Sequence, residues 1–76
     1  MAVWYSILEV HRRWEVLAGT EALALMRTLE DAVGFANAMA DILARRGVSA
    51  GVRVRVPSGG WLVQRPMPAA APSRRA

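Results

Sequence analysis

Few side chains in this chain of 76 residues could do chemistry. There is no cysteine and no lysine, and the single histidine, His11, stands just before two arginines in a segment with the character of a turn. A histidine in a turn is typically solvated, and no spacing typical of metal ligands is present. The remaining nucleophiles are serine and threonine hydroxyls, none of them in a nucleophile-elbow context. We therefore expect no enzyme and no catalytic, cofactor-binding or metal-ligating residue.

Two further groups of residues also lack the features of a site. Glu9 and Glu15 could approach each other across a predicted hairpin, but Arg12 and Arg13 are close enough in sequence to pair with them. The pair Gly59-Gly60 leads into a strand and not into a helix, which a phosphate-binding glycine loop requires. The sequence therefore predicts no small-molecule ligand.

Arginine is the residue type with the strongest potential for binding. All ten basic residues are arginine, the net charge is +4, and guanidinium groups suit bidentate contacts with phosphate. Arg53 and Arg55 alternate with valines, so together with Gln64 they are candidate contacts for an anion or a nucleic acid on a solvent-facing sheet. The alternative is a solvated charge row that limits aggregation. We expect no aromatic residue on this arginine face, although sheets that bind single strands use such residues.

The elements that would position these residues begin with a hairpin. β-formers dominate residues 3–10 and residues 13–18, and the turn between them falls near His11-Arg12. Residues 21–27 are compatible with a strand or with a helix. A helix running from Thr20 to Arg46 would be about 40 Å long, too long for so small a domain. We therefore place a short strand or an extended segment at 23–27.

A helix is predicted from Leu29 to Arg46. The segment Thr28-Leu29-Glu30-Asp31 has the form of a capping box, and the run Arg45-Arg46-Gly47 supplies cations and a glycine at the helix end. One stripe of small and aliphatic residues suits packing on a sheet. A second stripe, formed by Phe35, Met39 and Ile42, is either a wide core contact or an oligomer contact.

The last predicted element is a second hairpin. Residues 52–56 alternate valine with arginine, and residues 61–65 follow after the turn-forming sequence Pro57-Ser58-Gly59-Gly60. Pairing Val56 with Trp61 would place Arg53 opposite Gln64 and Arg55 opposite Leu62. The expected fold class is α+β, an antiparallel sheet of four or five strands with one helix packed on one face, in the order ββ(β)αββ.

Size and exposed aromatic residues favour self-association. Residues 1–65 are expected to form a single α+β domain, and residues 66–76 a disordered Pro/Ala/Arg tail. A domain of this size has a small core, and without cysteine it has no disulfide to reinforce it. Trp4 and Tyr5 point to opposite faces of the first strand, which leaves one of them to be covered. The candidate contacts of a homodimer are Trp4, Tyr5, Phe35, Met39 and Ile42.

No run approaches the ~20 apolar residues of a membrane span. The first residues lack the basic segment of a secretory signal, so a cytoplasmic protein without membrane partners is expected.

Two resemblances complete the sequence analysis. Trp14-x-Val16, Thr28-Leu29-Glu30-Asp31-Ala32 and Gly60-Trp61 resemble a small bacterial domain-of-unknown-function family with a hairpin–helix–hairpin layout, which implies a fold and no activity. The same Thr28–Ala32 segment is similar to the helix start of antitoxins with a partial ribonuclease-H-like fold. Two functions are thus hypothesised: a non-enzymatic, self-associating protein-interaction module, or an arginine-mediated nucleic-acid-binding or antitoxin-like regulatory protein.

Overall fold

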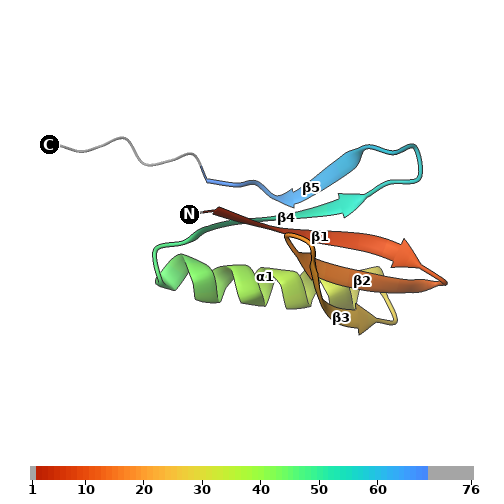
Figure 1. Ribbon diagram of the computed structural model, residues 1–76, viewed down its shortest axis with the longest axis horizontal. Coiled ribbons are helices and arrows are strands. Elements are labelled where there is room, and N and C mark those ends of the chain that lie inside the picture. The colour runs from red at the N-terminus through yellow and green to blue at the C-terminus, as the bar shows by residue number, and fades with distance from the viewer. Residues whose placement is uncertain (1, 69–76) are drawn as a thin grey trace, which may run out of the picture.

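The computed structural model describes residues 2–68 of the chain as one helix packed on a five-stranded sheet (Figure 1). The elements in order are β1 (Ala2–Val10), β2 (Arg13–Ala18), β3 (Glu21–Met26), α1 (Leu29–Arg45), β4 (Ser49–Arg55) and β5 (Trp61–Arg65). The predicted α+β class, with a single helix on one face of the sheet, is confirmed. Residues 21–27, whose sequence is compatible with a strand or with a helix, contain the strand β3. Residues 69–76 of the predicted tail lie outside the described residues.

The strand order is β3-β2-β1-β4-β5. Three of the four neighbouring pairs are antiparallel, but β1 and β4 are parallel, with a register that runs from Ala2↔Ser49 to Ile7↔Val54. The expectation of a wholly antiparallel sheet is therefore corrected for this central pair. The reason is topological. The chain reverses direction after each of β1, β2, β3 and α1, so β4 runs in the same direction as β1 and β3. The antiparallel neighbour β2 is already paired on both sides, so β4 can join the sheet only in parallel.

The helix begins at Leu29 as predicted and ends at Arg45, one residue before the predicted end. The Thr28 hydroxyl accepts a hydrogen bond from the backbone N–H of Asp31 at 3.0 Å, which satisfies one of the free donors at the helix start. At the other end Gly47 has a φ of 79°, and the N–H of Val48 donates to the carbonyl of Leu43 at 2.9 Å. A left-handed glycine just after the helix allows this reversal without a Cβ penalty.

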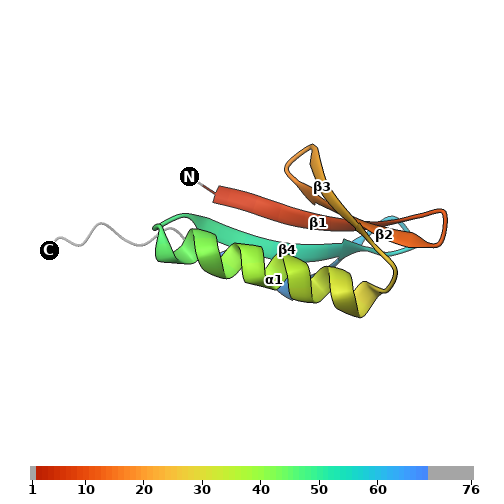
Figure 2. The ribbon, with the colours of Figure 1, turned by 90° about the horizontal axis from the view of Figure 1, so that it is seen from below.

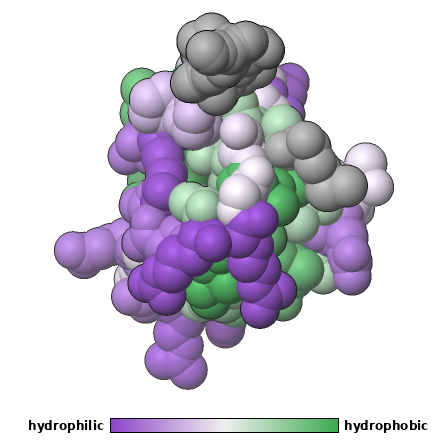
Figure 3. All heavy atoms as spheres, turned by 90° about the vertical axis from the view of Figure 1, so that its left-hand side faces the viewer, coloured by the Kyte–Doolittle hydropathy of each residue, from purple (hydrophilic) through white to green (hydrophobic). Residues whose placement is uncertain are grey.

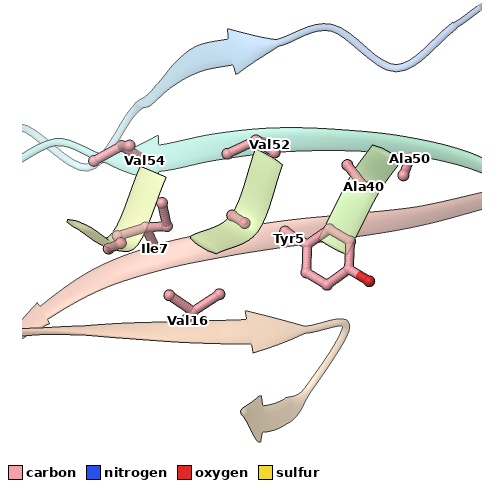
Figure 4. Packing of buried hydrophobic residues seen from close by; sticks show 9 residues of the cluster. Tyr5, Ile7, Val16, Ala40, Ala50, Val52 and Val54 are labelled. Atoms are coloured by element: carbon pink, nitrogen blue, oxygen red, sulfur yellow. The ribbon is translucent and has the colours of Figure 1, made fainter. Parts of the chain in front are cut away.

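The core lies between α1 and the central strands (Figure 4). Ile7, Val16 and Val52 are fully buried, and the helix contributes small alanines that allow close approach to the sheet. Burying one larger aliphatic side chain, such as Ile7 or Val52, contributes about 1.5–3 kcal/mol to the stability of the fold. The ion pair between Arg65 and Asp41, at 2.7 Å, is partly exposed and contributes at most about 1 kcal/mol. Core packing is therefore the main interaction between α1 and the sheet, and the ion pair adds a weaker contact between α1 and β5.

The final hairpin pairs in a register different from the expected one. Val52 faces Arg65 as predicted, but Arg53 faces Val63 and Arg55 faces Trp61, with an irregularity after Val52. The cause lies in the turn, where the N–H of Val56 donates to the carbonyl of Gly60 at 3.0 Å. Gly60 thus takes the pairing position predicted for Trp61 and shifts the following residues by one. The extra residue Gln64 bulges out before the predicted register is regained.

Candidate functional site

One face of the sheet carries the helix, and no other element of residues 2–68 covers the opposite face, which we call the open face (Figure 2). Tyr5 and Ile7 of β1 point toward α1, so the residues between them along the strand point to the open face. Cross-strand partners share a face. By this register the open face contains Ala2, Trp4, Ser6, Leu8, Val10, Arg13, Glu15, Leu17, Ala22, Leu25, Ser49, Gly51, Arg53, Arg55, Trp61 and Val63.

Two tryptophans and two arginines come together on this face. The guanidinium carbon of Arg53 lies 4.9 Å from the ring centroid of Trp4 on β1 and 4.1 Å from that of Trp61 on β5. The guanidinium of Arg55 lies 5.2 Å from the same Trp61 ring. We call these four residues the tryptophan–arginine cluster. Each contact falls within the distance at which a cation is attracted by an aromatic face.

The position of Arg53 is fixed by the strands around it. Its Nε donates a hydrogen bond to Oγ of Ser6 at 3.1 Å, and Ser6 is almost completely buried. This bond satisfies a hydroxyl that would be costly to bury alone. Trp4 in turn lies against the backbone of Gly51 on β4, where no side chain intervenes. The guanidinium is thus held between two rings, while its terminal nitrogens make no hydrogen bond to another described residue.

The charges of the protein are distributed unevenly between its two faces. Residues 2–68 contain eight arginines and six carboxylates. Three of these arginines (Arg13, Arg53 and Arg55) and one carboxylate (Glu15) lie on the open face, which leaves five of each sign elsewhere. Within the described part of the chain the single ion pair is that of Arg65 with Asp41, on the helix side. The net positive charge of residues 2–68 therefore comes from the open face.

Both predicted arginine contacts lie in the cluster, and the third predicted residue does not. Arg53 and Arg55 are on the open face, whereas Gln64 is the bulged residue on the edge strand β5 and has no partner on β4. The expectation that no aromatic residue shares the arginine face is wrong, because the shifted register brings Trp61 there. Trp4 was predicted only as an oligomer contact. The alternation of residues predicted the face of the arginines, but nothing in the sequence marked the bulge that moves Trp61.

The other predicted oligomer contacts lie apart from the open face. Tyr5 is buried in the core, with only 3% of its surface exposed, so it has no surface to offer a second copy. Phe35 and Met39 are half-buried and pack against the core, which supports the wide-core-contact alternative for that stripe. Ile42 is exposed on the helix.

A shallow hollow of about 380 Å³ adjoins the cluster. It opens where β1 and β4 part after the pair Ile7↔Val54, and its wall includes Leu8 and Val10 on one side and Arg55 and Pro57 on the other. The lining is mostly apolar. Arg55 belongs both to this hollow and to the cluster, whereas Glu9 and Trp14, which also line the hollow, lie on the helix side of the sheet.

The remaining candidate groups do not gather into a second site among the described residues. His11 is exposed in the β1–β2 turn with a φ of 50°, and no group of three or more histidine or carboxylate side chains that could hold a metal ion occurs within residues 2–68.

At the opposite end of the molecule, where α1 ends and β4 begins, hydrophilic side chains surround a hydrophobic centre (Figure 3).

Over residues 2–68, no helix has the length and apolar character needed to cross a membrane. Comparison of the chain with protein-family models, with curated proteins and with solved structures gave no match.

Proposed function

We propose that this protein is a non-enzymatic binding module whose open face binds single-stranded nucleic acid through the tryptophan–arginine cluster. The observation that carries the proposal is the position of Arg53 between the rings of Trp4 and Trp61 on an uncovered sheet face. Sheets that bind single strands combine basic groups, which follow the phosphates, with aromatic rings on which bases stack.

Trp61 is the residue best placed to stack on a base. It is 37% exposed, although it lies against two guanidinium groups. Stacking of one base on an aromatic side chain is worth about 1–3 kcal/mol. Arg53 complements this contact, since a guanidinium that is already stacked and hydrogen-bonded loses little freedom when it donates to a phosphate. Arg55 is exposed on the same strand and extends the cationic surface toward the hollow.

The charge of the open face favours a polyanion over an ordinary protein partner. Three arginines against one glutamate would repel a second copy of the same face, but they would displace counterions from a nucleic acid strand.

The proposal is tested by titrating labelled single-stranded oligonucleotides, RNA and DNA of mixed sequence, into the whole protein. Binding should be detected at about 50 mM salt and weaken steeply toward about 200 mM, as expected for phosphate contacts. The double variant Arg53→Ala/Arg55→Ala should abolish it. The matched control is Arg45→Ala/Arg46→Ala, which removes the same charge at the exposed end of α1.

Absence of binding by the wild-type protein at low salt would overturn the proposal. So would an equal loss in the two double variants, because that result would show a response to net charge alone and not to the open face. Circular dichroism of each variant confirms that the fold is retained.

Self-association is the second candidate function. It is supported by large apolar residues that stay exposed away from the cluster, among them Leu23 and Leu25. An antitoxin-like regulatory role in the cytoplasm would be one setting in which nucleic-acid binding and self-association occur together.

A further inference from the structure

The strand β3 forms one edge of the sheet, and its outer side faces no other strand of residues 2–68. An edge strand presents unpaired backbone donors and acceptors, and proteins protect it with charged residues (above all lysine), proline, inward-pointing charges or a β-bulge. The sequence of β3 is Glu-Ala-Leu-Ala-Leu-Met, which contains neither proline nor a basic residue. Leu25 is 58% exposed and Leu23 is 38% exposed. This edge therefore offers an apolar strand with free backbone groups.

The opposite edge, β5, is protected in ways that β3 is not. Arg65 lies within β5 and donates to the carboxylate of Asp41 at 2.7 Å and to the backbone carbonyl of Asn37 at 3.2 Å. These contacts fasten the end of the strand to the helix. Pro66 follows directly and cannot donate to a ladder. The two edges thus differ, and β3 is the one suited to pairing.

The usable part of β3 is set by its irregularity. The register with β2 shifts between Val16 and Leu17, which leaves Leu23 as the extra residue. From Ala24 to Met26 the pairing is regular. A partner strand can therefore add to the outer side of this regular segment, whose centre is Leu25.

We propose that β3 is a homodimer interface, in which two copies pair antiparallel about Leu25 and join their sheets into one. A second copy fits because an antiparallel strand pair is self-complementary about a two-fold axis. The first residue of the strand, Glu21, is acidic and the residue that follows the strand, Arg27, is basic, and neither forms an ion pair with another described residue. Antiparallel pairing brings the acidic end of one strand toward the basic end of the other.

The dimer has a consequence for the open face. The two-fold axis of an antiparallel pair stands perpendicular to the sheet, so both open faces lie on the same side of the joined sheet. Two tryptophan–arginine clusters would then share one continuous surface. The interface itself does not depend on nucleic-acid binding, and it is tested without nucleic acid.

The absence of cysteine from the chain allows a direct test. Opposite residues of an antiparallel pair have Cα atoms about 4.5–5.5 Å apart, within the range that a disulfide spans. Leu25→Cys should therefore give a covalent dimer on mild oxidation. The matched control is Leu62→Cys on β5, because Leu62 is 54% exposed. This variant should stay monomeric in sodium dodecyl sulfate electrophoresis without reducing agent.

Sedimentation velocity supplies the second measurement. The wild-type protein should sediment as a dimer, Leu25→Lys as a monomer, and Leu62→Lys as a dimer. A wild-type protein that stays monomeric over the micromolar range overturns the proposal. A dimer that survives Leu25→Lys and is lost in Val63→Lys also overturns it, because the contact would then lie at β5 and not at the edge strand β3.

Discussion

The indole ring of Trp4 lies directly against the backbone of Gly51, its partner on the parallel strand β4. A Cβ atom at position 51 would lie 2.6 Å from Cζ3 of that ring and 3.0 Å from the carbonyl oxygen of Arg65. The approach to the ring is too close for a real Cβ atom, and the approach to the backbone oxygen is tight, so Trp4 would have to move. The absence of a side chain at position 51 therefore places Trp4 where it contacts Arg53.

Substitution of this glycine should disturb both the fold and the cluster. We expect Gly51→Ala to lower the free energy of unfolding by about 1–3 kcal/mol, as overpacking does, and to weaken nucleic-acid binding because Trp4 is displaced from Arg53. Denaturant unfolding and oligonucleotide titration measure the two effects. Gly34→Ala is the control, because Gly34 is an exposed helix residue and an added Cβ would meet no atom within 4 Å beyond its chain neighbours and the backbone of its own helix. It should raise stability by about 0.5–1 kcal/mol. Unchanged binding in Gly51→Ala would show that Trp4 does not position Arg53.

Arg53 should not be replaceable by lysine. Its guanidinium contacts two rings and donates to Ser6, whereas an ammonium group cannot stack in the same way. We expect Arg53→Lys to weaken oligonucleotide binding about tenfold, which corresponds to a loss of roughly 1.4 kcal/mol of binding free energy. Arg55→Lys keeps the charge of an exposed side chain with one ring contact, so its effect should be smaller. Equal effects of the two variants would assign Arg53 a purely electrostatic role.

Trp61 should decide the preference for single strands. We expect Trp61→Ala to reduce affinity for a single strand by about 1–3 kcal/mol, the value of one stacked base. Affinity for a duplex of the same length should change little, because paired bases are not free to stack on the ring. Fluorescence anisotropy with both ligands measures the difference. Leu62→Ala, the neighbouring position on the other face of β5, is the control. A parallel loss for both ligands would argue against stacking.

The helix and the second hairpin differ in how far the sequence could predict them. The bounds of α1 depend on Thr28 and Gly47, whose effects are local and therefore visible in the sequence. Which side chains of β5 lie on which face depends on whether Gly60 or Trp61 pairs with Val56. The residues of the turn are compatible with either pairing. A shift of one position exchanges the faces of all side chains until a bulge restores the register. For this reason Arg53 and Arg55 were predicted on one face, but Trp61 was not predicted beside them.

The turn between β1 and β2 stores strain that can be removed. His11 and Arg12 have φ values of 50° and 66°, the left-handed region that residues with a Cβ adopt at a cost of about 1–2 kcal/mol each. The double variant His11→Asn/Arg12→Gly supplies the residues that such two-residue turns prefer. Part of the gain is offset by the flexibility of glycine in the unfolded chain, so we expect a net stabilisation of about 1 kcal/mol. Thermal unfolding should show a midpoint higher by about 4–8 °C. A lower midpoint would mean that the native side chains hold the turn through contacts of their own.

Dimerisation through β3 and binding on the open face together predict a dependence on strand length. In the joined sheet the two Arg53 side chains are separated by seven strand spacings, or about 34 Å. At a stacked rise of about 3.4 Å, roughly ten nucleotides are needed to bridge them. The dimer-breaking variant Leu25→Lys should therefore lose about tenfold or more in affinity for a strand of about twenty nucleotides, through lost bivalency. Its affinity for a strand of about five nucleotides should equal that of the wild type, because the cluster itself is intact. An equal loss for both lengths would instead place Leu25 in the binding surface.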